Sequence, residues 1–197
     1  MNGAQLTSTR RMGPAGSANW HAMLDGAEDI LREEGYAALT SRAVAERIGV
    51  KQRLVYYYFA TMDDLIVETF RRLSARELER MRRVSEAPQP LRELWDVCIH
   101  TTDARLISEF MALANRSEGL KAEVVVFIER SRAIQMEALT AALKASGRET
   151  RIAPVGLVML ATSAALSMNR EAELGVDLGH AEIAAAIGSF LLEMEAD

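Results

Sequence analysis

The side chains best suited to chemistry in this chain lie close together, between residues 40 and 61. They are hydroxyl, cationic, amide and phenol groups: Thr40, Arg42, Lys51, Gln52, Arg53, Tyr56, Tyr57 and Thr61. Such groups bond to phosphates, and arginine and glutamine also pair with guanine and adenine edges in the major groove. These residue types at this spacing indicate a surface that contacts double-stranded DNA.

Two short helices separated by Gly49 are expected to position these side chains. Thr40 or Ser41 can cap the first helix, because a hydroxyl there accepts a hydrogen bond from a free backbone N–H. Gly49 ends that helix, since glycine adopts a left-handed backbone without strain. The second helix begins near Lys51, and its apolar residues can pack inward: Leu54, Val55 and Phe59. The pattern predicts a helix-turn-helix whose second helix is basic.

Charge is distributed unevenly along the 197 residues, which carry a formal net charge of −5. Residues 1–83 contain 13 Lys/Arg and 11 Asp/Glu, whereas residues 84–197 contain 10 and 17. A mildly basic N-terminal part joined to an acidic part is expected where only one end meets DNA. The sequence contains no run of about 20 apolar residues and no secretory h-region, so we expect a cytoplasmic protein that does not interact with a membrane.

Helical periodicity extends over the rest of the chain and predicts an all-α fold. Residues 1–17 read as a flexible arm, in which Arg10 and Arg11 are either minor-groove contacts or a solvated tail. Thr61 and Asp64 match a capping box that opens a long connector helix. Pro88 and Pro90 mark the next break. Further helices are expected at 91–99, 105–114, 120–144, 152–169 and 183–194.

The sequence contains no recognisable set of residues for metal-dependent or nucleophilic catalysis. It contains three histidines and a single cysteine, Cys98, with no His-Glu-x-x-His pair and no glycine-rich phosphate loop. We therefore expect a protein that is not an enzyme, with no catalytic residues, no metal and no cofactor.

The run from Gly49 to Phe59, followed by Asp63-Asp64-Leu65, resembles the recognition-helix signature of the tetracycline-repressor (TetR) family. The segment from Ile30 to Val50 matches the family pattern at the same spacing, so the resemblance covers about residues 20–70. It implies a helix-turn-helix DNA-binding domain at 18–65. It also implies a connector helix and a helical effector-binding and dimerisation domain at 66–197.

The resemblance also bears on individual side chains. It implies that Tyr56 and Tyr57 face phosphate and that Tyr58 faces the core. The sequence departs from the family where Arg53 replaces a small residue and Met62 replaces a common lysine, which removes one phosphate contact. Arg53 either replaces that charge or reads a guanine.

The C-terminal part offers candidates for a ligand cavity. Flexible methionines and aromatics adapt to apolar guests, although they equally form ordinary cores. The candidates are Trp95, Phe110, Met111, Phe127, Met136 and Met159. His100 precedes Asp103 by three residues, so the pair is either an inducer contact or an exposed ion pair.

Small and apolar residues near the C-terminus suggest a dimer interface. The small segment runs from Ala161 to Ala165, and a later helix carries the apolar stripe Ile183, Ile187, Phe190 and Leu191. Together they suggest a two-fold four-helix interface between two copies of the chain, or alternatively the core of a monomer.

These observations lead to one functional hypothesis and one alternative. We expect a homodimeric transcriptional repressor that binds a palindromic operator and is released by a small apolar inducer. The alternative is a helical dimer that binds a ligand or a protein without binding an operator.

Overall fold

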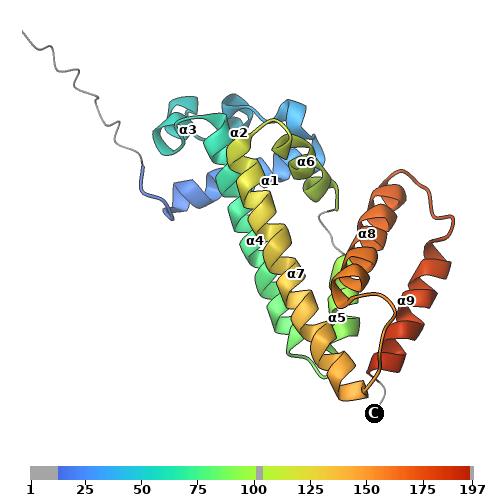
Figure 1. Ribbon diagram of the computed structural model, residues 1–197. Coiled ribbons are helices and arrows are strands. Elements are labelled where there is room, and N and C mark those ends of the chain that lie inside the picture. The colour runs from blue at the N-terminus through green and yellow to red at the C-terminus, as the bar shows by residue number, and fades with distance from the viewer. Residues whose placement is uncertain (1–12, 101–103, 196–197) are drawn as a thin grey trace, which may run out of the picture. The chain divides into compact units, whose positions relative to one another are not determined.

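The computed structural model describes residues 13–100 and 104–195. Over these residues the fold is all-helical, with nine α-helices, one 3-10 turn and no strand, which confirms the predicted class. The chain divides into two compact units, residues 1–69 and 70–197, which we call the head and the body. Figure 1 shows the helices coloured in chain order.

The head contains α1 (Ala18–Glu33), the 3-10 turn η1 (Tyr36–Ala38), α2 (Ser41–Arg47), α3 (Gln52–Tyr58) and the start of α4 (Met62–Ser85). Ser17 caps α1, because its hydroxyl accepts a hydrogen bond from the Trp20 N–H at 3.3 Å. The apolar stripe of α1 meets residues of α2, α3 and α4 in a small core: Met23, Leu24, Ile30, Leu31, Val44, Val55, Phe59 and Leu65. This core holds α2 and α3 in place.

The body begins within α4 and adds five helices: α5 (Pro90–Ile99), α6 (Ala104–Ala114), α7 (Glu118–Ser146), α8 (Pro154–Glu173) and α9 (His180–Met194). Pro90 and Pro154 each open a helix at its first turn, where proline is favoured because it lacks a backbone N–H. Gly147 follows α7 with φ of +63°, a left-handed conformation that suits glycine. The expected helices are present, with boundaries that shift by a few residues.

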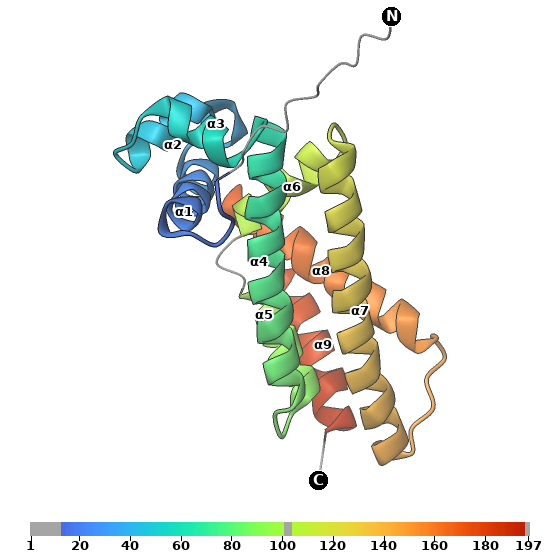
Figure 2. The same cartoon turned by 90° about the vertical axis from the view of Figure 1, so that its left-hand side faces the viewer.

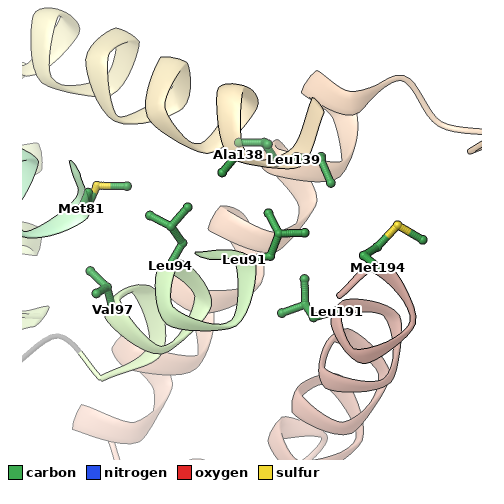
Figure 3. Packing of buried hydrophobic residues seen from close by; sticks show 9 residues of the cluster. Met81, Leu91, Leu94, Val97, Ala138, Leu139, Leu191 and Met194 are labelled. Carbon is green, nitrogen blue, oxygen red and sulfur yellow. The ribbon is translucent and has the colours of Figure 1, made fainter. Parts of the chain in front are cut away.

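Side chains from several body helices point toward one another in a buried cluster (Figure 3). Its members are Met81, Leu91, Leu94, Val97, Ala138, Leu139, Val158, Leu191 and Met194. The body part of α4 runs beside α7 (Figure 2), where the Phe70 ring lies 6.0 Å from Phe127 and Arg71 pairs with Glu123 at 2.7 Å. The body therefore packs α5, α7, α8 and α9 around one apolar centre.

No helix in the described parts of the chain has the length and hydropathy that a bilayer crossing requires.

Candidate functional site

The turn between α2 and α3 has the geometry that the sequence predicts. Gly49 has φ of +70°, and the Val50 N–H donates to the Ala45 carbonyl at 2.9 Å. A side chain at Gly49 would meet open space, so a substitution there would cost backbone strain alone. At the start of α2, the Thr40 hydroxyl accepts from the Ala43 N–H at 3.1 Å, which confirms the cap.

The outer face of α3 is polar and cationic. Lys51, Gln52 and Arg53 are exposed, and Tyr57 retains 42% of its accessible surface, whereas Val55 on the inner face is 1% exposed. Neither Lys51 nor Arg53 forms an ion pair with any residue that the structure describes. Two uncompensated cations therefore stand on the exposed face of a short, well-anchored helix.

A chain of hydrogen bonds fixes α3 against α2. The Gln52 amide donates to the Ser41 hydroxyl at 2.8 Å, and the Ser41 hydroxyl donates to the Tyr56 phenol oxygen at 3.0 Å. Ser41 is only 4% exposed, so the hydroxyl that joins the two bonds is buried, although Gln52 itself is exposed. The sequence alone indicates Ser41 only as a possible helix cap, so this role was not predicted. Gln52 and Tyr56 are thus held in position by a buried hydroxyl.

The arginines of α2 are both paired. Arg42 donates to Glu46 at 2.8 Å on the exposed surface, and this hydrogen bond raises the pKa of Arg42 above its ordinary value. Arg47 reaches Glu33 at 2.8 Å and Glu34 at 2.6 Å, and it thereby ties α2 to the end of α1. No local sequence pattern marks these pairs, because the partners are 13 and 14 positions apart. Arg42 would have to exchange Glu46 for a phosphate to contact DNA.

Thr61 opens α4 in the predicted capping box. Its N–H donates to the Asp64 carboxylate at 2.9 Å, and the Asp64 N–H donates to the Thr61 hydroxyl at 3.1 Å. The motif is confirmed, and it commits the Thr61 amide to Asp64 in this structure.

Gly13 lies against the end of α3. Its N–H donates to the Tyr57 carbonyl at 2.8 Å, and a Cβ atom at this position would stand 2.6 Å from the Tyr58 ring. Arg10 and Arg11, the possible minor-groove contacts, lie outside the described residues.

Two of the cavities in the body adjoin each other. The larger, of about 400 Å³, lies between α5, α7, α8 and α9 and has an almost wholly apolar lining. The smaller, of about 240 Å³, is bounded by α4, α5, α6, α7 and α8. Cys98 and Gln135 line both cavities and therefore separate them. Burial raises the pKa of the Cys98 thiol to about 11, so the thiol is protonated near neutral pH.

The predicted ligand residues fall into three groups. Trp95 lines the larger cavity, while Met111, Phe127 and Met159 line the smaller one. Phe110 is fully buried with its ring 5.1 Å from that of Phe70, and Met136 packs against the body core. His100 lies on the surface and bonds to Asp96 at 2.7 Å, whereas its predicted partner Asp103 lies outside the described residues.

The predicted interface residues also differ in their burial and surroundings. Ala165 and Leu191 are 2% and 8% exposed within one chain, and Ala161 lines the larger cavity. Ile187 and Phe190 pack partly against the body core, while Ile183 is 44% exposed. These three residues and Leu191 also line the larger cavity. Other large apolar side chains, for which no interface role was predicted, are exposed on α8 and α9: Val155, Met159, Leu160, Leu166 and Leu192.

Comparison with known proteins identifies similarities in both sequence and fold. Residues 23–69 match the family model described as bacterial regulatory proteins, tetR family. No curated protein sequence matches the chain. A TetR transcription regulator from Haloarcula marismortui is 20% identical over 87% of this chain and 94% of its own, with a TM-score of 0.74.

Two further solved structures have the same fold at low identity. Salmonella enterica GusR is 13% identical, over 93% of this chain and 100% of its own, with a TM-score of 0.70. The reduced form of E. coli NemR is 13% identical, over 79% of this chain and 87% of its own, with a TM-score of 0.69. At these identities the similarity shows the fold alone.

Proposed function

We propose, on the premise that this chain is a TetR-family transcriptional regulator, that it is a homodimeric repressor released from a palindromic operator by a small effector with a largely apolar body. The proposal has three parts: the reading of DNA by α3, the pairing of two chains, and the binding of the effector in the body.

The observation that carries the proposal is the exposed face of α3. Lys51 and Arg53 have no ion-pair partner among the described residues, so their charges are available to a polyanion. The buried Ser41 network orients Gln52 and Tyr56 beside them. A rigid polar helix of this kind suits a major groove, with Arg53 as a candidate for bidentate contact with guanine. Thr40, Arg42, Tyr57 and Thr61 are proposed phosphate contacts.

The dimer is supported by the apolar surface of α8 and α9. Leu160 on α8 is 58% exposed. On α9, Leu192 is 52% exposed and Ile183 is 44% exposed. Large aliphatic side chains on two helices favour association with another apolar surface. A second copy of the chain supplies that surface, and its second α3 would read the other half of a palindrome.

The effector is proposed to bind in the cavities of the body. Their lining is mainly apolar, and polar groups such as Gln135 are few, which is typical of small-molecule sites. Release requires that the effector bind the DNA-incompetent state better. A tenfold preference corresponds to about 1.4 kcal/mol of coupling.

Selection from a pool of random duplexes tests the DNA-binding part. The wild-type chain should enrich a palindrome whose half-site centres are about one helical turn apart, or a multiple of it. Arg53→Ala should enrich the same palindrome with relaxed preference at one base pair in each half-site, because one base contact is lost.

Arg32→Ala serves as the matched control, since it removes the same charge from the last turn of α1, where Arg32 pairs with Asp29. It should reproduce the wild-type selection. A wild-type pool without any enriched sequence would contradict the proposal and favour the helical dimer without an operator.

A further inference from the structure

The smaller cavity has an unusual distribution of charge. Most of its lining is apolar, including Met81, Phe127 and Leu166, but two charged side chains, Glu77 and Arg132, also reach it. Charged groups do not strengthen the binding of a purely apolar ligand, because each charge must stay solvated or paired. The partners of these two residues therefore decide which ligands the cavity can accept.

Glu77 already has a counter-ion on its own helix. Its carboxylate lies 4.0 Å from the Arg80 guanidinium, three residues further along α4. Arg132 on α7 is different, because it is partly buried and forms no ion pair with any residue in the described parts of the chain. The positive charge of Arg132 is thus the one left for a ligand to neutralise.

Hydroxyl groups on α7 and α8 also line this cavity. Ser131 donates to the Ile128 carbonyl at 3.0 Å, and Thr162 donates to Gln135 at 3.2 Å, so both protons are in use. Ser163 also lines the cavity and has no hydrogen-bond partner among the described residues. Its hydroxyl can therefore donate to a ligand in this cavity.

We propose that the smaller cavity binds an amphipathic carboxylate, with the carboxylate on Arg132 and the apolar chain along the methionines and Phe127. The planar guanidinium fork matches a carboxylate, and burial strengthens the pair because water screens it less. A volume of about 240 Å³ suits a short chain, and a longer chain would pass Cys98 and Gln135 into the larger apolar cavity. This inference rests on the proposed function, because it names the chemical class of the effector.

Calorimetric titration of the full chain with three probes of equal chain length tests the proposal. The probes are octanoate, 1-octanol and octylammonium, which differ in the charge of the head group. Octanoate should bind most tightly. Arg132→Gln should weaken octanoate about tenfold or more and leave 1-octanol unchanged, because only the charged hydrogen bonds are lost.

Three further variants separate charge from structure. Arg130→Gln removes an exposed cation two positions away on α7, outside the cavity lining, and should leave octanoate binding unchanged. Arg132→Lys should bind octanoate more tightly than Arg132→Gln but less tightly than wild type, because it keeps the charge and loses the fork. Glu77→Gln should not weaken octanoate, since it removes only a negative charge. Thermal unfolding of each variant verifies that it is folded.

Equal binding of octanoate and 1-octanol to the wild-type chain, preference for octylammonium, or an Arg132→Gln variant that binds octanoate as wild type does would each overturn the inference. Operator binding, measured without any probe on the same preparations, separates this inference from the proposed function. Arg132-dependent octanoate binding in a chain that binds no operator would refute the proposed repressor and uphold the carboxylate site.

Discussion

Helices α3 and α8 both leave large side chains exposed, but the chemistry of the two surfaces is opposite. On α3 the exposed residues include Lys51 and Arg53, while on α8 they include Leu160 and Leu166. A cationic surface binds a polyanion, and the affinity falls as the salt concentration rises. An aliphatic surface is stabilised when another apolar surface covers it, and this stabilisation depends little on salt. We propose that the two surfaces bind different partners, and ionic strength can distinguish them.

The interiors of the two units differ as well. In the head, the Ser41 hydroxyl links α2 to α3, and the ion pairs of Arg47 tie α2 to the end of α1. In the body, the interior is mainly apolar and contains cavities, including two that adjoin each other. A reading surface benefits from rigid positioning, whereas a ligand site needs free volume.

Removal of a large ring from the body core should have the largest effect. Phe110 is 0% exposed and contacts the Phe70 ring, so Phe110→Ala should lower the free energy of unfolding by roughly 3–5 kcal/mol. Urea denaturation measures the change. His100→Ala is the exposed control and should change it by less than about 0.5 kcal/mol. Equal effects of the two variants would contradict the assignment of Phe110 to the core.

The buried thiol should react far more slowly than an exposed one. Burial raises the pKa of Cys98 to about 11, so at pH 7 only about one thiol in 10,000 is the reactive thiolate. Alkylation with iodoacetamide should therefore be at least about a hundredfold slower than in the urea-unfolded chain. The rate should rise about tenfold for each pH unit from 7 to 9, because the thiolate is populated as the pH approaches the pKa. Rapid labelling of the folded chain at pH 7 would contradict this burial.

A charge on the aliphatic surface should weaken the dimer. Leu192→Glu places a carboxylate on α9 outside both cavity linings, and we expect a loss of about 2 kcal/mol of association free energy. Sedimentation equilibrium at low and high salt measures the dimer dissociation constant. Val125→Glu, at an equally exposed aliphatic site on α7, is the control. If the Leu192→Glu variant dimerised as tightly as wild type, the proposed interface on α9 would be contradicted.

Single cations of α3 should affect DNA affinity in distinguishable ways. Arg53→Ala should cost about 1–3 kcal/mol on the operator if Arg53 reads a base, with a smaller loss on unrelated DNA. Lys51→Ala should weaken both duplexes to a similar extent and reduce the salt slope by about one. Fluorescence anisotropy measures the affinity of each variant for both duplexes. Identical behaviour of the two variants would remove the distinction between base and phosphate contacts.

Loss of the buried hydroxyl of the head should have the smallest effect. Ser41→Ala removes the hydrogen bonds to Gln52 and Tyr56, and we expect a loss of about 1 kcal/mol in the free energy of unfolding. Weaker discrimination between the operator and unrelated DNA should accompany it, because Gln52 and Tyr56 lose their fixed orientation. Unchanged discrimination would show that the Ser41 network only stabilises the head.

Local features of the fold could be predicted from the sequence because their causes are local. The Gly49 turn, the Thr40 cap and the Thr61–Asp64 capping box each depend on residues within a few positions, and the structure contains all three. The body helices could be predicted for the same reason, since their apolar spacing follows the helical repeat.

Long-range features could not be predicted in this way. Periodicity identifies a buried face but does not distinguish a filled core from a cavity. Phe110 and Met111 are neighbours in the sequence, yet Phe110 packs into the core and Met111 lines the smaller cavity. The ion pairs of Arg47 and the bond between Ser41 and Tyr56 also join residues that are 13 to 15 positions apart.

The central claim, that the head reads a specific DNA sequence, is tested most directly by fluorescence anisotropy. The purified chain is titrated against the duplex immediately upstream of its own gene and against an unrelated duplex of equal length, at several salt concentrations. We expect tighter binding to the upstream duplex, with an affinity that falls steeply as salt rises. No binding to either duplex at low salt would contradict it.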